Sequence, residues 1–279
     1  MFTTEQLIEQ ALLEDIGEGD HTSEATIPSS ATGKMKLLVK ENGILAGTDI
    51  AKIVFSKVDP LIKMEQLIAD GSEIKKGDIV FYVTGPCKSM LIAERTVLNF
   101  MQRMSGIATA TNQYVKLLAG TKARLLDTRK TTPNMRVFEK MAVRLGGGTN
   151  HRMGLYDMVM IKDNHVDFAG GIEKAIKAEH NYLKQRNKNL KIEIEVRNFI
   201  ELEEVIRVGG VDIIMLDNFT PADLAKAVKM IDGRFETEAS GGITLKTIRE
   251  YAETGVDFIS VGAITHQIKS LDLSLKTVE

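Results

Sequence analysis

The sequence predicts an α/β fold in which a small α+β domain precedes a βα barrel, and three observations indicate it. The chain has 279 residues, 43% of them hydrophobic and 27% charged, a globular composition long enough for roughly two domains. Its first part has short apolar runs punctuated by glycine. After Lys122, strand-like and helix-like segments alternate as in a βα repeat.

The first part opens with an amphipathic helix, which the i, i+3, i+4 spacing of apolar residues predicts over residues 4–16. Between residues 33 and 85, apolar runs bounded by glycine predict short strands, with one helix over 49–58. Residues 88–119 predict a long helix, interrupted near residues 105–106, that links the two domains.

Strand candidates follow Lys122 at a spacing that leaves room for one helix after each. They are residues 123–127, 158–161, 192–196, 212–217, the weaker 235–239, and 258–262. Six strands are fewer than a complete barrel needs, so either the barrel is incomplete or one strand around residues 142–148 has escaped recognition.

Several of these strands end in polar residues, among them Glu195, Asp217 and Glu238. The carboxyl ends of the strands carry the chemistry in βα barrels, so we expect these side chains to converge on one rim. The alternative is that strand ends are simply where a chain becomes polar. Glu195 and Asp217 are candidate contacts for Mg²⁺ or for ribose hydroxyls, with a salt bridge to basic residues as the competing interpretation.

Positive charge is concentrated in residues 122–165. The formal net charge of the chain is −2, so no overall field attracts nucleic acid or an acidic membrane. This segment nevertheless holds nine lysines and arginines against four acids, a charge of +5. It indicates an anion site, although Arg136, Lys140 and Arg144 could form a solvated helix face instead. With two aromatic residues for stacking, the segment fits a small, multiply anionic ligand better than nucleic acid.

Two loops within this basic segment, residues 127–133 and 146–157, combine threonine, glycine, asparagine, histidine and arginine. Glycine permits close approach of the backbone, and the planar fork of arginine matches a carboxylate or a phosphate with two hydrogen bonds. The loops are therefore candidates for gripping oxyanions. A flexible turn for the three glycines and a structural, hydrogen-bonded role for His151 are the alternatives.

Location follows from cysteine usage and from the start of the chain. The single cysteine, Cys87, cannot form an intramolecular disulfide. Residues 1–16 lack the pattern of a signal peptide, and no apolar run is long enough to span a membrane. We expect a cytoplasmic protein without a membrane or nucleic-acid partner.

Six segments carry a resemblance to a known family: ALLEDIGEGDHTSEATIP (11–28), ERTVLNFMQRMSGIAT (94–109), DTRKTTPNMRVFEKMAVRLGGGTNHRMGLYDMVMIKDNH (127–165), LDNF (216–219), EASGGIT (238–244) and VGAITH (261–266). Together they resemble quinolinate phosphoribosyltransferase, also called nicotinate-nucleotide pyrophosphorylase (carboxylating). The resemblance implies an N-terminal α+β sandwich domain over residues 1–108, joined by a C-terminal helix over 266–279, and an incomplete α/β barrel over 109–265. It also implies a homodimer with shared active sites.

The resemblance further implies an activity: transfer of phosphoribosyl from phosphoribosyl pyrophosphate to quinolinate, with loss of CO₂, to give nicotinate mononucleotide for NAD biosynthesis. Two alternatives stay open. One is a related phosphoribosyltransferase of the same fold that acts on another acid, such as the protein found with molybdate transport genes. The other is a phosphate-binding barrel without catalytic activity.

Site residues are implied by the same segments. The residues that match quinolinate-binding positions are Arg95, Arg129, His151, Arg152 and Lys162. The residues that match positions for phosphoribosyl pyrophosphate and its Mg²⁺ are Lys130, Glu195, Asp217, Ser240, Gly241 and Gly262, of which Lys130, Glu195 and Asp217 are the expected catalytic residues, and Glu195 and Asp217 the expected metal ligands.

Two positions qualify this assignment. Asn134 stands where the family usually has glycine, and asparagine tolerates a positive φ better than most residues, so we expect the turn to survive. Glu195 matches the family better than Glu193, with strand alternation as the only internal check.

Overall fold

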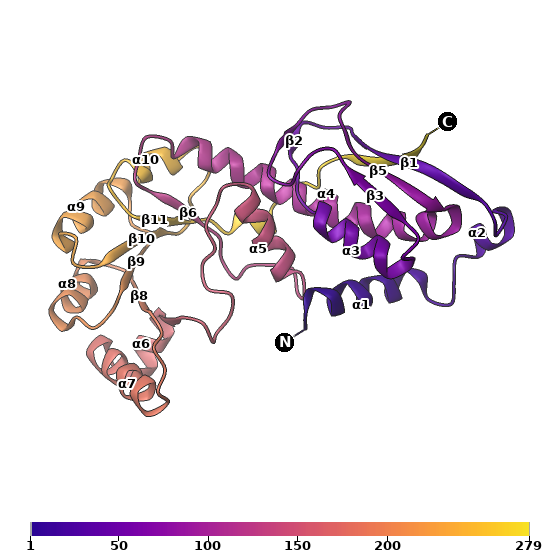
Figure 1. Cartoon of the computed structure of the whole chain (residues 1–279). Helices are drawn as coiled ribbons and strands as arrows, with labels where there is room; N and C mark the ends of the chain where they lie inside the picture. Colours follow the sequence, from indigo (N-terminus) through magenta and orange to yellow (C-terminus); the bar gives the residue numbers. More distant parts are fainter. Residues whose placement is uncertain (1, 279) are drawn as a thin grey trace. The chain divides into compact units, whose positions relative to one another are not determined.

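Figure 1 shows the computed structural model, which describes residues 2–278. The chain forms two compact units. The first contains the residues up to 112, Thr131–Gly147 and the segment from Ile264 onward, and the second contains Gln113–Lys130 and Gly148–Ala263. Each unit is built around a sheet of its own.

The first unit has an antiparallel sheet in the order β12-β1-β5-β3. Phe55 of helix α3 packs edge to face on Phe81 of strand β5, with ring centroids 6.1 Å apart. The expected helices over residues 4–16 and 49–58 are confirmed. The elements are α1 (Thr4–Ile16), α2 (His21–Thr26), β1 (Thr32–Val39), β2 (Gly43–Ile44), α3 (Thr48–Val58), β3 (Lys63–Gln66), β4 (Glu73–Ile74), β5 (Ile79–Pro86), α4 (Cys87–Leu117), α5 (Arg136–Leu145), α11 (Ala263–His266) and β12 (Leu273–Thr277), of which α4 and α11 cross between the units.

The C-terminal segment ends in a strand, so the helix expected over residues 266–279 is wrong. Leu271, Leu273 and Leu275 are buried and the residues between them are not. That period of two is the pattern of a strand with one buried face. Strand β12 pairs antiparallel with β1, with Leu275 opposite Leu37. The helix followed from the family resemblance, whereas the local leucine spacing indicates a strand.

Helix α4 runs without a break over 31 residues, so the expected interruption near residues 105–106 is also wrong. The hydroxyl of Ser105 is buried and accepts a hydrogen bond from the Ala46 amide at 3.0 Å. At Gly106, a Cβ atom would overlap the carbonyl oxygen of Lys269. The serine and the glycine therefore serve close packing within the first unit rather than breaking the helix.

Helix α5 groups with the first unit, although the resemblance assigned it to the barrel over residues 109–265. The buried carboxylate of Glu139 accepts hydrogen bonds from Arg103 Nε at 2.8 Å and from its terminal nitrogen at 2.6 Å. Phe138 packs on Phe100 with ring centroids 4.8 Å apart. Lys140 is 2% exposed, which rules out a fully solvated basic face on this helix.

The second unit has a parallel sheet of six strands in the order β6-β11-β10-β9-β8-β7. All six strand candidates are confirmed, including the weak one over residues 235–239. The elements are β6 (Arg124–Leu126), β7 (Val159–Ile161), α6 (Asp163–Ala169), α7 (Ile172–Gln185), β8 (Ile192–Val196), α8 (Phe199–Val208), β9 (Ile213–Asp217), α9 (Pro221–Ile231), β10 (Glu236–Ser240), α10 (Ile248–Ala252) and β11 (Phe258–Ser260).

The barrel is incomplete, as the resemblance implies, which decides between the two alternatives that the sequence left open. Within residues 2–278 this sheet has six strands, with β6 and β7 at its ends. The region around residues 142–148 holds the end of helix α5, and beside β6 only a single parallel bridge forms, between Leu126 and Thr149. Helices α8, α9 and α10 lie on one side of the strands, which leaves the other side as the barrel interior (Figure 1).

No helix within residues 2–278 is both long and apolar enough to cross a membrane.

We predict that Gly106→Ala destabilises the protein. In an open helix, alanine in place of glycine stabilises by about 1 kcal/mol. Here the added methyl group meets the backbone of Lys269, and overpacking of this kind costs about 1–3 kcal/mol. Urea unfolding should show a lower free energy of unfolding for the variant. An increase would mean that the C-terminal segment does not pack against Gly106.

Candidate active site

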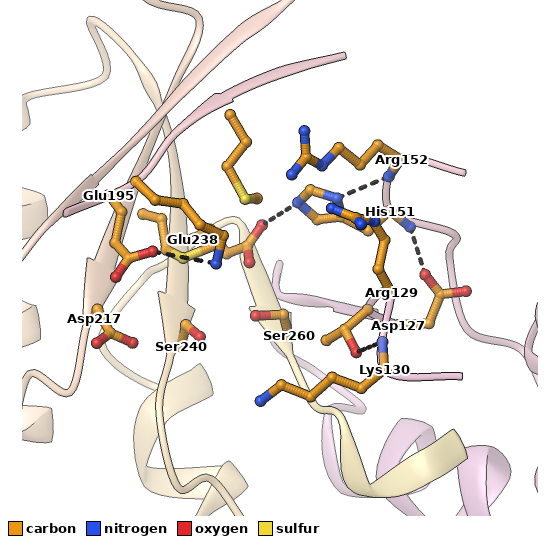
Figure 2. Close-up of a pocket in the computed structure, with 14 residues that line it drawn as sticks. Asp127, Arg129, Lys130, His151, Arg152, Glu195, Asp217, Glu238, Ser240 and Ser260 are labelled. Carbon is orange, nitrogen blue, oxygen red and sulfur yellow. Dashed lines mark hydrogen bonds and ion pairs between the residues drawn. The ribbon is translucent and has the colours of Figure 1, made fainter. Parts of the chain in front are cut away.

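A cavity of about 230 Å³ lies inside the second unit, at the carboxyl ends of its strands (Figure 2). Its lining is rich in charged side chains of both signs. The lining residues are Asp127, Thr128, Arg129, Lys130, His151, Arg152, Met160, Lys162, Glu195, Met215, Asp217, Glu238, Ser240 and Ser260.

The register of the parallel strands brings these side chains together. Glu195 on β8 lies opposite Met215 on β9, which lies opposite Glu238 on β10. One layer further along, Asp217 lies opposite Ser240. Residues in register on neighbouring parallel strands point to the same face, so all five side chains reach the barrel interior.

Two arginines form the basic part of the cavity. Arg129 follows strand β6, and Arg152 is 9% exposed and donates a hydrogen bond to the carbonyl of Met158 at 3.2 Å. Burial and the nearby positive charge of Arg129 lower the pKa of Arg152, against the opposing charges of Glu193 and Asp157. Two guanidinium groups held close enough to repel each other favour an anion between them.

The acidic part of the cavity consists of Glu195 and Asp217. Burial raises the pKa of Glu195; Lys162, whose Nζ lies 3.6 Å from Glu195 Oε2, opposes this increase, and Asp217 reinforces it. Burial also raises the pKa of Asp217, against a hydrogen bond from Asn218 and the charge of Lys162. Half-buried carboxylates that repel each other at a polar rim are hard-oxygen donors, and this donor set fits Mg²⁺.

The turn after β10 is shaped by glycine. Gly241 has a φ of 101°, and a Cβ atom there would overlap the Asn218 side chain. The Asn218 amide donates to the carbonyl of Ser240 at 2.8 Å, and Asn218 Nδ2 donates to Asp217 Oδ2 at 2.6 Å. The turn thus leaves backbone close to the cavity and orients the Asp217 carboxylate.

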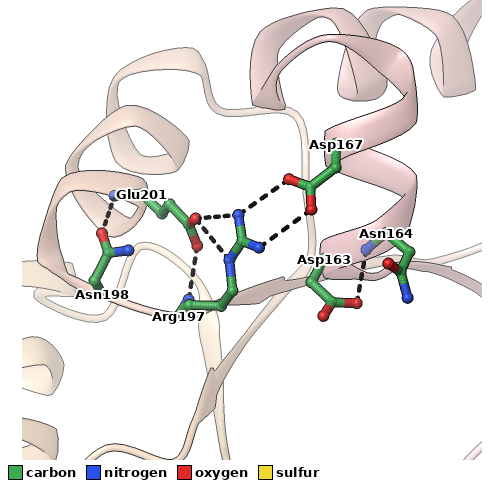
Figure 3. Close-up of polar contacts among 6 residues, drawn as sticks. All are labelled: Asp163, Asn164, Asp167, Arg197, Asn198 and Glu201. Carbon is green, nitrogen blue, oxygen red and sulfur yellow. Dashed lines mark hydrogen bonds and ion pairs between the residues drawn. The ribbon is translucent and has the colours of Figure 1, made fainter.

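Ion pairs around Arg197 hold helix α6 near the end of β8 (Figure 3). The guanidinium of Arg197 donates to both oxygens of Asp167 on α6, at 3.2 and 3.3 Å. It also donates from Nε to Glu201 on α8 at 2.9 Å. Since Lys162 is the residue at the N-cap of α6, these contacts help to hold Lys162 beside Glu195.

The loop before β7 is anchored by a buried carboxylate. Asp127 has no exposed surface and accepts hydrogen bonds from the His151 amide at 2.8 Å and from Asn150 Nδ2 at 2.6 Å. The Arg152 amide donates to His151 Nδ1 at 2.7 Å. His151 Nε2 lies 2.9 Å from Glu193 Oε2 and 3.4 Å from Glu238 Oε2, and both glutamates are fully buried.

The pKa of His151 and the hydrogen bond at its Nδ1 favour different protonation states of the ring. Burial alone lowers the pKa of His151, but hydrogen bonds to Glu193 and Glu238 outweigh it and raise the pKa to about 10. A doubly protonated ring, however, has no lone pair on Nδ1 to accept the Arg152 amide. Burial and the charge of Glu238 raise the pKa of Glu193 to about 7. We therefore assign one ring proton to Nε2 and one further proton to be shared by the two glutamates. This arrangement has the same total charge as a doubly protonated imidazole beside two ionised glutamates.

The structure brings most of the predicted site residues together. Those that line the cavity are Arg129, Lys130, His151, Arg152, Lys162, Glu195, Asp217 and Ser240. Gly241 follows β10, and Gly262 lies between β11 and α11. Arg95 is an exposed residue of α4 in the first unit and is not among the residues that line this cavity.

Two sequence questions have structural answers. Asn134 has a φ of 61°, so asparagine does adopt the left-handed conformation expected of it. Glu193 and Glu195 are two residues apart on β8 and both point inward, so the alternation of the strand could not distinguish them. Glu195 lines the cavity, and Glu193 contacts His151.

Three buried acids, Asp127, Glu193 and Glu238, were not among the site residues that the resemblance implied. Of these, Glu238 was expected at the rim as a strand-end residue, and Glu193 was weighed against Glu195. Each was visible in the sequence as an acid within or at the end of a strand. An acid at an inward-facing position of a strand is the signal that could have identified them. Such a carboxylate needs a partner, because an unpaired carboxylate is not stable inside a barrel.

The fold and the cavity define a class of protein: an α/β-barrel protein whose strand ends bind a multiply anionic ligand beside carboxylates suited to a divalent cation. The chain belongs to the quinolinate phosphoribosyltransferase family. Residues 20–105 match the profile "Quinolinate phosphoribosyl transferase, N-terminal domain", and residues 107–276 match that of the C-terminal domain.

Individual relatives agree with this assignment. The chain is 47% identical to quinolinate phosphoribosyltransferase (decarboxylating) 1b of Nicotiana tabacum, over 97% of this chain and 81% of that protein. It is 41% identical to the probable nicotinate-nucleotide pyrophosphorylase (carboxylating) of Bacillus subtilis, over 97% and 92%. The solved structure of the nicotinate-nucleotide pyrophosphorylase from Francisella tularensis superposes with a TM-score of 0.92 at 42% identity, over 99% of this chain and 96% of that one.

We predict that His151 carries its proton on Nε2 at neutral pH, because Nδ1 accepts the Arg152 amide. In protein labelled with ¹⁵N-histidine, one ring nitrogen should show the shift of a protonated nitrogen and the other that of an unprotonated one. The signal is assigned by its loss in His151→Gln. Two protonated nitrogens would contradict the assignment and would fit a pKa near 10 instead.

Proposed function

We propose that this chain transfers the phosphoribosyl group of phosphoribosyl pyrophosphate to quinolinate and releases pyrophosphate and CO₂, giving nicotinate mononucleotide for NAD biosynthesis. The observation that carries the proposal is the cavity itself, in which Arg129 and Arg152 lie close enough to repel each other, opposite Glu195 and Asp217. The family membership, and relatives named for this reaction, support it.

Quinolinate is a dicarboxylate, and we assign its carboxylates to the basic part of the cavity. Arg129 and Arg152 supply planar donor forks, and Lys162 adds a positive charge near the rim. His151 is a further candidate, although both ring nitrogens already have partners within the protein, so a contact with substrate would exchange one of those bonds.

Phosphoribosyl pyrophosphate belongs, in this proposal, at the rim formed by Lys130, Ser240 and the glycine turn after it. Backbone amides of such turns and a lysine suit phosphate oxygens. Glu195 and Asp217 would hold Mg²⁺, which neutralises charge on the pyrophosphate when it is bound. Gly262, at the end of the next strand, is an additional candidate for a phosphate contact.

The first chemical step joins the pyridine nitrogen of quinolinate to C1 of the ribose while pyrophosphate leaves. Positive charge develops on the ribose and negative charge on the leaving group. In this proposal Glu195 stabilises the charge on the ribose, and Lys130 stabilises the charge on the leaving pyrophosphate. No covalent bond to the protein is needed, so the side chains act by orientation and electrostatics.

The second step removes CO₂ from C2 of the ring. The electron pair of the broken bond stays on C2 beside the now cationic ring nitrogen, and C2 then takes a proton from water. Because the ring nitrogen itself stabilises this charge, the protein needs mainly to hold the ring and to exclude bulk solvent.

A coupled assay for release of pyrophosphate that depends on quinolinate tests the proposal directly. Release with quinolinate supports it. Release only with another acid would favour a related phosphoribosyltransferase, and binding without any release would favour a phosphate-binding barrel. The cytoplasmic location and the homodimer stay part of the proposal; sedimentation of the purified protein tests the dimer.

We predict that Arg129→Lys weakens quinolinate binding roughly ten- to hundredfold. The charge is unchanged, but an ammonium group cannot reproduce the two-point grip on a carboxylate, and the lost charge-assisted hydrogen bonds contribute about 1.5–3 kcal/mol. Calorimetric titration of quinolinate measures the effect. A dissociation constant within twofold of wild type would contradict this role of Arg129.

We predict that nicotinate, which lacks the 2-carboxylate, is a poor substrate. In its complex, Arg129 or Arg152 would lack the ligand carboxylate that it binds in quinolinate, and a missing charge-assisted contact discriminates more strongly than a missing methylene. Turnover of nicotinate and quinolinate is compared at equal enzyme concentration. Comparable turnover would favour the related phosphoribosyltransferase.

We predict that Arg95 enters the active site of the partner subunit, as the family resemblance implies. Arg95→Ala and Arg129→Ala should each be inactive alone and should complement each other when refolded together. Random pairing makes half of the dimers mixed, and one site of each mixed dimer receives both intact arginines. Roughly a quarter of the wild-type activity should therefore return. Activity near zero, after demonstrated subunit exchange, would mean that Arg95 serves its own chain or only the fold.

A further inference from the structure

Two fully buried glutamates in the second unit have no part in the reaction steps above. Glu193 lies on β8, and Glu238 lies on β10, with strand β9 between them. A buried carboxylate is costly unless it is paired, and an apolar residue at either position would avoid that cost. Their presence inside the barrel therefore calls for a task that an apolar side chain could not perform.

Both glutamates meet the same atom. His151 Nε2 lies 2.9 Å from an oxygen of Glu193 and 3.4 Å from an oxygen of Glu238. One oxygen from each glutamate and this nitrogen lie within 4.8 Å of one another. The shorter contact is within hydrogen-bond distance, so a proton on Nε2 lies next to the Glu193 carboxylate. Figure 2 shows His151 turned toward Glu238 from the opposite wall of the cavity.

The other side of the imidazole supports the backbone of an arginine. His151 Nδ1 accepts the Arg152 amide at 2.7 Å, which requires the ring to keep one orientation. The same segment is held on its other side by Asp127, through the His151 amide at 2.8 Å. The position of Arg152 in the cavity thus depends on the angle of the His151 ring, and Glu193 and Glu238 fix that angle.

We propose that Glu193 and Glu238 are positioning residues that act through His151 to hold Arg152 in place for a carboxylate of the substrate. The inference rests on the proposed function for the identity of that substrate. The nearer glutamate, Glu193, contributes more, and Glu238 is a second acceptor that takes over in part when Glu193 is changed. Neither residue needs to touch quinolinate.

Conservative glutamine variants test the proposal. We expect Glu193→Gln to raise the dissociation constant of quinolinate three- to tenfold, Glu238→Gln to raise it less than threefold, and the double variant to raise it more than the product of the two. KM for phosphoribosyl pyrophosphate should stay within twofold in each. Asp257→Asn is the matched control, because Asp257 is a partly buried acid that accepts hydrogen bonds from Thr237, next to Glu238, and does not contact His151. It should lower the melting temperature without changing quinolinate binding.

Amide spectra give a readout that does not depend on the reaction. The ¹H–¹⁵N signal of Arg152 should shift in Glu193→Gln and in the double variant, and should stay in place in Asp257→Asn. Unchanged quinolinate affinity in Glu193→Gln, or equal loss of affinity for both substrates, would overturn the proposal. If the double variant does not fold, the two single variants still test the proposal, which requires a larger loss of quinolinate affinity in Glu193→Gln than in Glu238→Gln. A wild-type protein that does not bind quinolinate would contradict the proposed function instead, while the Arg152 signal still tests the positioning.

Discussion

The interior of the barrel carries charge, and each buried charge there depends on a partner. The pairing of His151 with Glu193 and Glu238 is the interaction on which the basic part of the cavity depends in our proposal, because His151 Nδ1 accepts the backbone amide of Arg152. Asp127 performs the corresponding task for the preceding residues of the loop. These buried acids place negative charge beside the basic part of the cavity, where Arg129 and Arg152 would otherwise repel one another.

The same constraint explains how the cavity holds side chains of both signs without these side chains neutralising one another. Lys162 Nζ and Glu195 Oε2 lie 3.6 Å apart, too far for a strong hydrogen bond, and the half-exposed Lys162 side chain is able to exchange partners. Arg129 and Arg152 have each other as neighbours. The proposed ligands, with separate carboxylate and phosphate ends and a divalent cation, would satisfy both the basic and the acidic part of the cavity at once.

Sequence patterns predicted the elements well wherever the period was local. The six parallel strands and the helices over residues 4–16 and 49–58 follow from side-chain spacing. The left-handed Asn134 followed from the glycine that the family usually has there, together with the backbone preference of asparagine. The break in α4 was predicted wrongly because a glycine in a helix can mark either an interruption or a site of close packing. At Gly106 the packing partner is Lys269, which is near in space but distant in sequence, so no local pattern shows it. The roles of Glu193 and Glu238 were out of reach for a related reason. Their partner, His151, lies on a loop whose position no local pattern encodes.

Strand β12 has a consequence for the order in which the protein can be completed. It pairs with β1, so nearly the whole chain lies between two neighbouring strands of one sheet. During synthesis, the barrel strands from β6 to β11 leave the ribosome before β12 exists, while β1 waits with one edge open. The first unit therefore begins to form early and is finished last. A strand edge exposed for that long is a site where a nascent chain can pair with another copy of itself. The exposure ends only when β12, which follows β11 in the chain, pairs with β1.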